Sequence, residues 1–180
     1  MTKPKKATVD VELTESNSPP GFTWEIESDL KKGKKLEFNN DHHPGFIVYF
    51  DIDDDDDTGF RFPDDHNRAI AVQTYTGTNP PCPTAGATWD QFYPTAVSKN
   101  NTRLEVRNLN EDPAEFAYTL FVTKDPHGTN PALEPIDPIG SNQNGPRLEP
   151  ASSFGTVALV VGVAAVAVAL AFTFNVFERR

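Results

Sequence analysis

Aspartates are the residues of this chain whose type and spacing best suit the binding of a cation. The stretch FDIDDDDDTGF, residues 50–60, places six aspartates within seven positions. Calcium takes oxygen ligands on a sharply turning loop. If Asp54 is the first position of an EF-hand loop, Asp56 is the third and Asp65 the twelfth. We therefore select Asp54, Asp56 and Asp65 as candidate ligands of a weak calcium site.

The match to an EF-hand is only partial. The twelfth position carries Asp65 where a bidentate glutamate is usual, the eighth carries Arg61, and the flanking segments alternate as strands do. A turn that must stay in water between two apolar strands has the same composition, and its like charges discourage edge-to-edge aggregation. The principal interpretation is a solvated loop, and calcium binding is the alternative.

Histidines provide a second, less favoured metal hypothesis. His42 and His43 lie in NNDHHPG, and Asp64, Asp65 and His66 lie in FPDDHN. Imidazole and carboxylate groups together suit a transition metal, so these five residues would form a site if the two loops meet. The competing interpretation is that the two neighbouring histidines cap a turn.

Residue patterns typical of enzymes are missing from the sequence. It contains no phosphate-binding loop, dinucleotide fingerprint, zinc-protease motif, CxxC pair or nucleophile elbow. The acidic run offers paired carboxylates, but nothing in it sets their pKa values apart, as acid–base catalysis requires. Cys82 is the only cysteine, so the chain forms no internal disulfide. We expect no catalytic and no cofactor-binding residues, and a metal-dependent enzyme is the weakest alternative.

The elements that hold these loops are short runs with period-two alternation, separated by turn signals about every ten residues. This pattern predicts an all-β antiparallel sandwich of about 7–9 strands with an immunoglobulin-like architecture, with a closed barrel as the alternative. The runs are TVDVEL, FTWEIES, KLEFN, GFIVYFDI, RAIAVQTY, RLEVRN and EFAYTLFVTK. The predicted core residues are Trp24, Phe38, Phe46, Val48, Phe50, Leu104, Val106, Phe116 and Leu120.

The amino-acid composition divides the chain into segments. Residues 1–7 are predicted to form a basic arm, residues 8–124 the sandwich, and residues 125–153 a linker rich in Pro, Gly and Asn. Within the linker, ALEPIDPI is suited to add a short edge segment to the sheet. Residues 154–177 form the helix described next, and residues 178–180 are a basic end.

Residues 154–177 are a stretch of 24 residues without a charge. As a helix it would be about 36 Å long, which exceeds a hydrocarbon core of about 30 Å. It is apolar on all sides, unlike a helix that lies on a membrane surface. We predict a single transmembrane helix that packs against neighbours through the small residues Gly155, Ala158 and Gly162.

Two features of the sequence favour opposite orientations of this helix. Arg179 and Arg180, against Arg147 before the helix, favour a cytoplasmic C-terminus. The N-terminal sequence has no apolar core of a signal peptide, which favours a cytoplasmic domain on a tail anchor. We expect a single-pass membrane protein with a cytoplasmic domain, and a periplasmic or extracellular domain is the alternative.

Net charge and architecture together limit the classes of function that this chain could have. A formal net charge of −10 argues against nucleic acid as a partner, because phosphate binding needs clustered Lys and Arg. We predict a non-catalytic accessory subunit that docks on a larger integral membrane complex, respiratory or photosynthetic, and that contacts membrane lipid. The alternative is a membrane-anchored sensor or effector that responds to a ligand or calcium and oligomerises through its helix.

Overall fold

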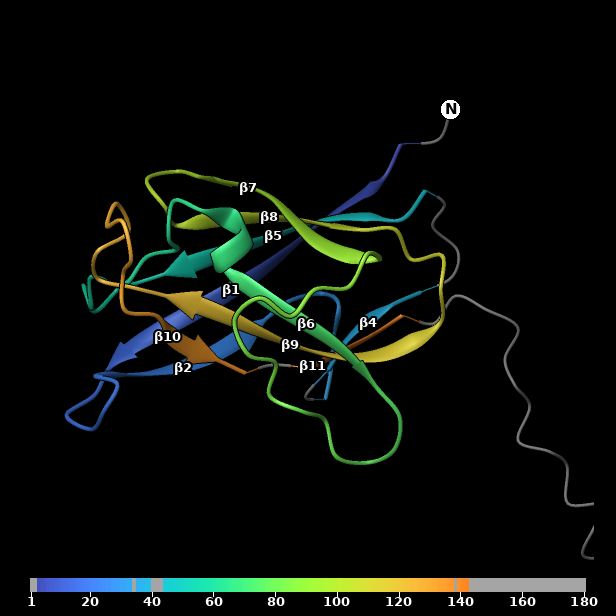
Figure 1. Cartoon of the computed structure of the whole chain (residues 1–180), viewed down its shortest axis with the longest axis horizontal. Coiled ribbons are helices and arrows are strands. Elements are labelled where there is room, and N and C mark those ends of the chain that lie inside the picture. Colours follow the sequence, from blue (N-terminus) through green and yellow to red (C-terminus); the bar gives the residue numbers. More distant parts are fainter. Residues whose placement is uncertain (1–2, 34, 40–43, 138, 143–180) are drawn as a thin grey trace, which may run out of the picture. The chain divides into compact units, whose positions relative to one another are not determined.

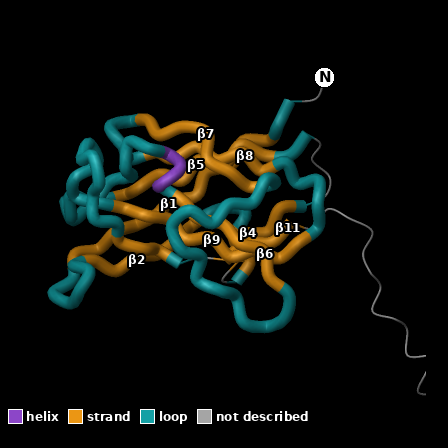
Figure 2. Tube along the Cα trace, viewed as in Figure 1, coloured by secondary structure: helices purple, strands orange, loops and turns teal. Residues whose placement is uncertain are grey.

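The computed structural model describes residues 3–33, 35–39, 44–137 and 139–142 of the chain. Over these residues the fold is all-β, as the alternation predicts, apart from the short 3₁₀ helix η1 (His66–Arg68). Figure 2 shows this helix as the only purple segment among the described residues. The strands are β1 (Lys5–Glu15), β2 (Phe22–Glu27), β3 (Lys31–Lys32), β4 (Lys35–Phe38), β5 (Phe46–Asp53), β6 (Ile70–Tyr75), β7 (Phe92–Ser98), β8 (Arg103–Asn108), β9 (Ala114–Val122), β10 (Glu134–Ile136) and β11 (Ile139–Asn142).

The strands form two sheets that lie one over the other (Figure 1). Sheet A has the order β2-β1-β5-β8-β7. Sheet B has the order β10-β9-β11-β4-β3, and β6 pairs with β9. The apolar run GFIVYFDI forms most of β5, which lies between β1 and β8 in the middle of sheet A.

Most strand pairs are antiparallel, as predicted, but two are parallel. β1 runs parallel to β5, with Val9 opposite Phe50, and β11 runs parallel to β4. The physical reason is the path of the chain: β3 and β4 lie in sheet B, and the chain then returns to sheet A as β5. Parallel neighbours need such a long crossover, whereas a short turn joins antiparallel strands.

One hydrophobic core joins the two sheets. Aromatic rings meet across the gap: Phe38 of sheet B lies 5.2 Å from Phe46 of sheet A, between ring centroids. The rings of Phe92 in sheet A and Phe116 in sheet B are 4.8 Å apart. Each such side chain contributes roughly 1.5–3 kcal/mol when it is fully buried. The two sheets are therefore held together chiefly by apolar packing.

The predicted core is confirmed for every residue except Trp24, which is 40% exposed. Trp24 lies opposite Leu13 and therefore on the same face of sheet A as that buried residue. β2 is the outermost strand of sheet A, where fewer neighbours cover an inward-facing side chain. This edge position explains the exposure of Trp24.

The sandwich extends beyond the predicted boundaries at both ends. β1 begins at Lys5, inside the predicted basic arm, and β10 and β11 lie in the predicted linker. β10 falls within ALEPIDPI and pairs with β9, so this segment does add a short strand to the sheet. β10 contains Pro135, which cannot donate a backbone hydrogen bond and is tolerated because β10 is an edge strand. Any linker therefore starts after Asn142, the last described residue.

The predicted membrane segment, residues 154–177, lies outside the described residues, as do Gly155, Ala158 and Gly162. Among the residues that are described, no helix is long and apolar enough to cross a membrane. By its contacts, every described residue belongs to one compact unit.

Tyr118 offers a test of the core. Its side chain is fully buried, and its hydroxyl has no hydrogen-bond partner among the described residues. Burial raises the pKa of this phenol well above its ordinary value. Because an unpaired buried hydroxyl is costly, Tyr118→Phe is expected to leave the free energy of unfolding unchanged or to raise it by about 1 kcal/mol.

The measurement is urea unfolding of the full chain in a neutral detergent, with tryptophan fluorescence as the signal. Both tryptophans of the chain, Trp24 and Trp89, lie in the sandwich, so the signal reports on this domain alone. Tyr49→Phe, at a half-buried position on the outside of sheet A, is the matched control and should not change stability. If Tyr118→Phe clearly lowers the free energy of unfolding and the control does not, the Tyr118 hydroxyl must have a hydrogen-bond partner, and this account is wrong.

Candidate functional site

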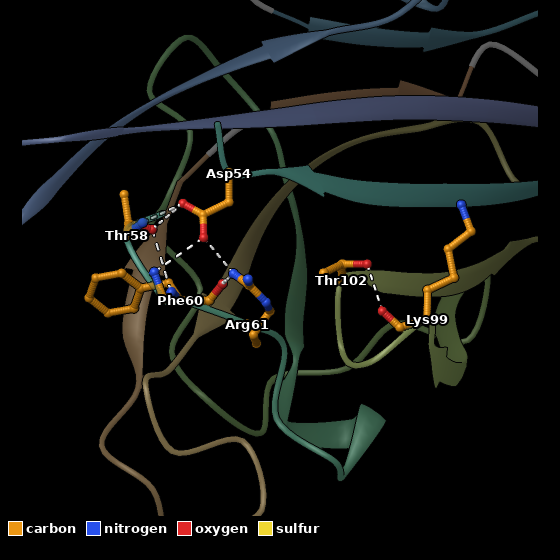
Figure 3. A network of polar contacts seen from close by, with 7 residues as sticks. Asp54, Thr58, Phe60, Arg61, Lys99 and Thr102 are labelled. Carbon is orange, nitrogen blue, oxygen red and sulfur yellow. Dashed lines mark hydrogen bonds and ion pairs between the residues drawn. The ribbon is translucent and has the colours of Figure 1, made fainter. Parts of the chain in front are cut away.

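The loop after β5 is organised around the carboxylate of Asp54 (Figure 3). Oδ1 accepts hydrogen bonds from the backbone N–H of Thr58 at 2.7 Å and from its hydroxyl at 2.6 Å. Oδ2 accepts from the N–H of Gly59 at 3.2 Å and from Nη1 of Arg61 at 2.5 Å. The Asp54 side chain is only 5% exposed. Both oxygens are thus engaged inside the protein and fasten the loop to itself.

The pKa of Asp54 follows from these contacts. Burial alone would raise the pKa, but the hydrogen bonds from Thr58, Arg61 and Gly59 outweigh it and hold the pKa below its ordinary value. Asp54 is therefore ionised at neutral pH and acts as the anchor of the loop.

The structure does not gather the other candidate calcium ligands around Asp54. Asp56 accepts a hydrogen bond from the backbone N–H of Glu15 at 3.2 Å. Asp65 caps η1 by accepting from the N–H of Asn67 at 3.0 Å. The three carboxylates thus serve three separate partners. Within the described ranges, no group of three or more His, Cys, Asp or Glu side chains is placed to hold a metal ion.

The loop also contains carboxylates that repel one another. Repulsion from Asp55 raises the pKa of Asp53, with a further contribution from Asp10 on the neighbouring strand. Both Asp53 and Asp55 are exposed. This arrangement agrees with the interpretation of a solvated, strongly acidic turn.

Of the proposed transition-metal site, His42 and His43 lie outside the described residues. Asp64, a further member, pairs instead with His127, whose Nδ1 lies 2.9 Å from Asp64 Oδ2. Asn101 donates to the same carboxylate from its side-chain Nδ2 at 2.7 Å. The hydrogen bond to Asp64 raises the pKa of His127. The pair fastens two exposed loops together.

Sequence reasoning missed this pair because 63 positions separate its members and no local motif marks either one. The one cysteine of the chain, Cys82, lies beside a different carboxylate, that of Asp137.

The outer face of sheet A carries an ordered cluster of aromatic and charged side chains. Arg103 forms a bidentate ion pair with Asp51, its neighbour across the β5–β8 ladder. The guanidinium group also lies 4.7 Å from the ring centroid of Tyr49. Nζ of Lys6, on β1, lies 5.7 Å from the same ring. We call these four residues, together with Arg107 and Tyr93 in the next row of the sheet, the outer cluster.

The outer cluster is held by polar contacts, and two of its residues, Lys6 and Tyr93, are exposed. Arg107 donates to the backbone oxygen of Pro44 at 2.5 Å, which fixes its side chain. Tyr93 is 37% exposed, one of the two large hydrophobic residues in the described part of the chain that are exposed. Arg and Tyr are enriched among the residues that dominate binding energy in protein interfaces. The arrangement is chemically suited to bind a protein surface.

Asp51 makes the stability of this cluster sensitive to acid. Hydrogen bonds from Arg103 hold the pKa of Asp51 below its ordinary value of 3.8. Because the folded pKa is the lower one, the stabilising contribution is present above the unfolded pKa and is lost as the pH falls through the folded pKa. The Asp51→Asn variant is expected to be less stable than wild type at neutral pH and to approach it in acid. Urea unfolding over a pH series measures the difference, and a pH-independent difference would contradict this account.

Neither a scan against protein-family models nor a search of curated proteins finds a match for this chain.

Proposed function

We propose that this chain is a membrane-anchored, non-catalytic docking protein whose β-sandwich binds a larger integral membrane complex. The observation that carries the proposal is the run of 24 uncharged residues at positions 154–177, which follows a complete two-sheet domain. A helix of this length and composition is suited to span a bilayer once and to pack through small residues. The sandwich would then act at the surface of the cytoplasmic leaflet.

The outer cluster supports a docking role for the sandwich. Two of its charged groups, Asp51 and Arg103, are already paired with each other, so binding would require little further ordering of these two side chains. An energy-converting complex, respiratory or photosynthetic, is the class of partner that we propose, because small single-helix subunits with a compact head fit at the periphery of such assemblies. We also propose that the strands of the sandwich have an immunoglobulin-like arrangement.

The proposal is tested by extracting the tagged full chain from its native membrane with a mild detergent. It predicts that the chain sediments with membranes and co-purifies with integral membrane proteins at a fixed stoichiometry. Tyr93→Ala should weaken this association, whereas Tyr75→Ala, a half-buried tyrosine on sheet B, should not. A chain that remains in the supernatant would refute the anchor. A chain that purifies alone and changes oligomeric state with a ligand would favour a sensor or effector instead.

A further inference from the structure

One half of β1 has an open edge. β1 pairs with β5 from Lys5 to Glu12, but it pairs with β2 only from Asp10 onward. Among the described residues, no strand covers positions 5–9 on the β2 side. Figure 1 shows the N-terminal part of β1 continuing beyond β2.

The direction of the backbone groups can be read from two hydrogen bonds. The N–H of Lys5 donates to Gly45 O at 3.0 Å, on the β5 side. Backbone groups of successive residues in a strand point to opposite edges, so those of Lys6 and Thr8 point to the open edge. The hydroxyl of Ser28 confirms this direction, because it donates to Thr8 O at 2.7 Å. The N–H and C=O of Lys6 and the N–H of Thr8 are therefore oriented to bond with an added strand.

Space for such a strand is present beside this edge. A groove of about 620 Å³ is lined by residues 5–8 and 10 of β1 and by residues 27–30 after β2. Both lysine side chains reach toward β5: Nζ of Lys5 lies 6.0 Å from the ring centroid of Phe46, and Nζ of Lys6 lies over Tyr49. Leu30 and Ala7, both half-buried, form the apolar part of the lining.

Charge indicates what kind of strand would bind. Glu27 at the end of β2 is neutralised by Lys31, whose Nζ lies 2.5 Å from its carboxylate. Lys5 and Lys6, at the N-terminal end of the lining, have no ion-pair partner in the described part of the chain. The lining also contains the carboxylates of Asp10, farther along β1, and Asp29, after β2. Side chains of an added strand would point alternately toward Lys6 on the outer face and toward Leu30 on the inner one.

We propose that this edge binds an extended peptide of a partner protein, with acidic residues toward Lys6 and apolar residues toward Leu30, which adds to sheet A as a further strand. The proposal rests on the docking function above and specifies the chemistry of the partner. Main-chain hydrogen bonds would provide affinity, and the alternating side chains would provide selectivity. Lys6 also belongs to the outer cluster, so the bound strand would border that surface.

The test uses the full chain in a neutral detergent and a short synthetic peptide that alternates glutamate and valine, labelled for fluorescence anisotropy. We expect saturable binding. N-methylation of successive peptide amides should have an alternating effect, because only every second N–H faces β1. A methyl group on a pairing amide should weaken binding about tenfold, and one on the next amide should have little effect. Absence of saturable binding, or a series without alternation, would overturn the proposal.

Charge reversal provides the matched variants. Lys6→Glu should weaken binding of the glutamate peptide about tenfold or more, whereas Lys124→Glu, at an exposed lysine after β9, should leave it unchanged. Tryptophan fluorescence verifies that both variants are folded. Equal effects of the two substitutions would show general charge attraction and would overturn the assignment to this edge. The assay needs no membrane, so its failure is distinguishable from failure of the proposed anchor.

Discussion

Replacing Asp54 with alanine is expected to lower the free energy of unfolding by about 3–5 kcal/mol, as for the loss of one partner of a buried ion pair. The substitution removes the acceptor of four hydrogen bonds, three from Thr58 and Gly59 and one from Arg61. The Arg61 side chain, only 27% exposed, would retain its bond to Phe60 O but lose its counter-ion. Asp54→Asn keeps the shape without the charge, and its loss should be smaller, about 1–3 kcal/mol.

Asp55→Asn is the matched control for this experiment. Asp55 is the next residue in the same acidic run, but it is exposed and raises the pKa of Asp53 by repulsion. Its replacement should leave stability close to wild type or raise it slightly. Urea unfolding with and without calcium completes the test. A calcium-dependent gain in stability that Asp54→Asn abolishes would restore the metal interpretation, because the ion would then compete with Arg61 for the carboxylate.

The contrast between Asp54 and its neighbours shows what sequence alone could and could not establish. The acidic run was correctly located after a buried strand, because β5 carries a clear apolar pattern. The role of Asp54 depends on which groups point at it. A carboxylate followed by Thr58 and Gly59 is a local turn signal that could have indicated this role.

Strand partners were harder to predict than strands. β5 and β8 follow the alternation residue by residue, since one face of each is buried in the core. The parallel pairing of β1 with β5 arises because the chain crosses to sheet B between these two strands. No short-range sequence pattern predicts this crossover. β10 lies within ALEPIDPI, the segment of the proline-rich stretch that is suited to add an edge strand, because an edge strand tolerates proline. β11 has no such signal in the sequence and continues beyond that segment.

Gly45 is the position where the smallest change should have one of the largest effects. It precedes β5, with a φ of +88°, a conformation that side chains other than glycine rarely adopt. A Cβ at this position would lie 2.2 Å from the backbone oxygen of Asn108 and 2.5 Å from that of Leu109. These atoms continue the β5–β8 ladder, in which Phe46 lies opposite Asn108, so they can move only if the ladder moves.

Gly45→Ala is therefore expected to lower the free energy of unfolding by roughly 2–5 kcal/mol, the sum of backbone strain and overpacking. Gly86→Ala separates the two contributions, because Gly86 has a φ of +93° but open space where its Cβ would lie. The control should show only the strain, about 1–2 kcal/mol. Urea unfolding by tryptophan fluorescence measures both variants under the same conditions. Equal losses would mean that the β8 backbone yields to the added methyl group, and the close approach at Gly45 would then not constrain the fold.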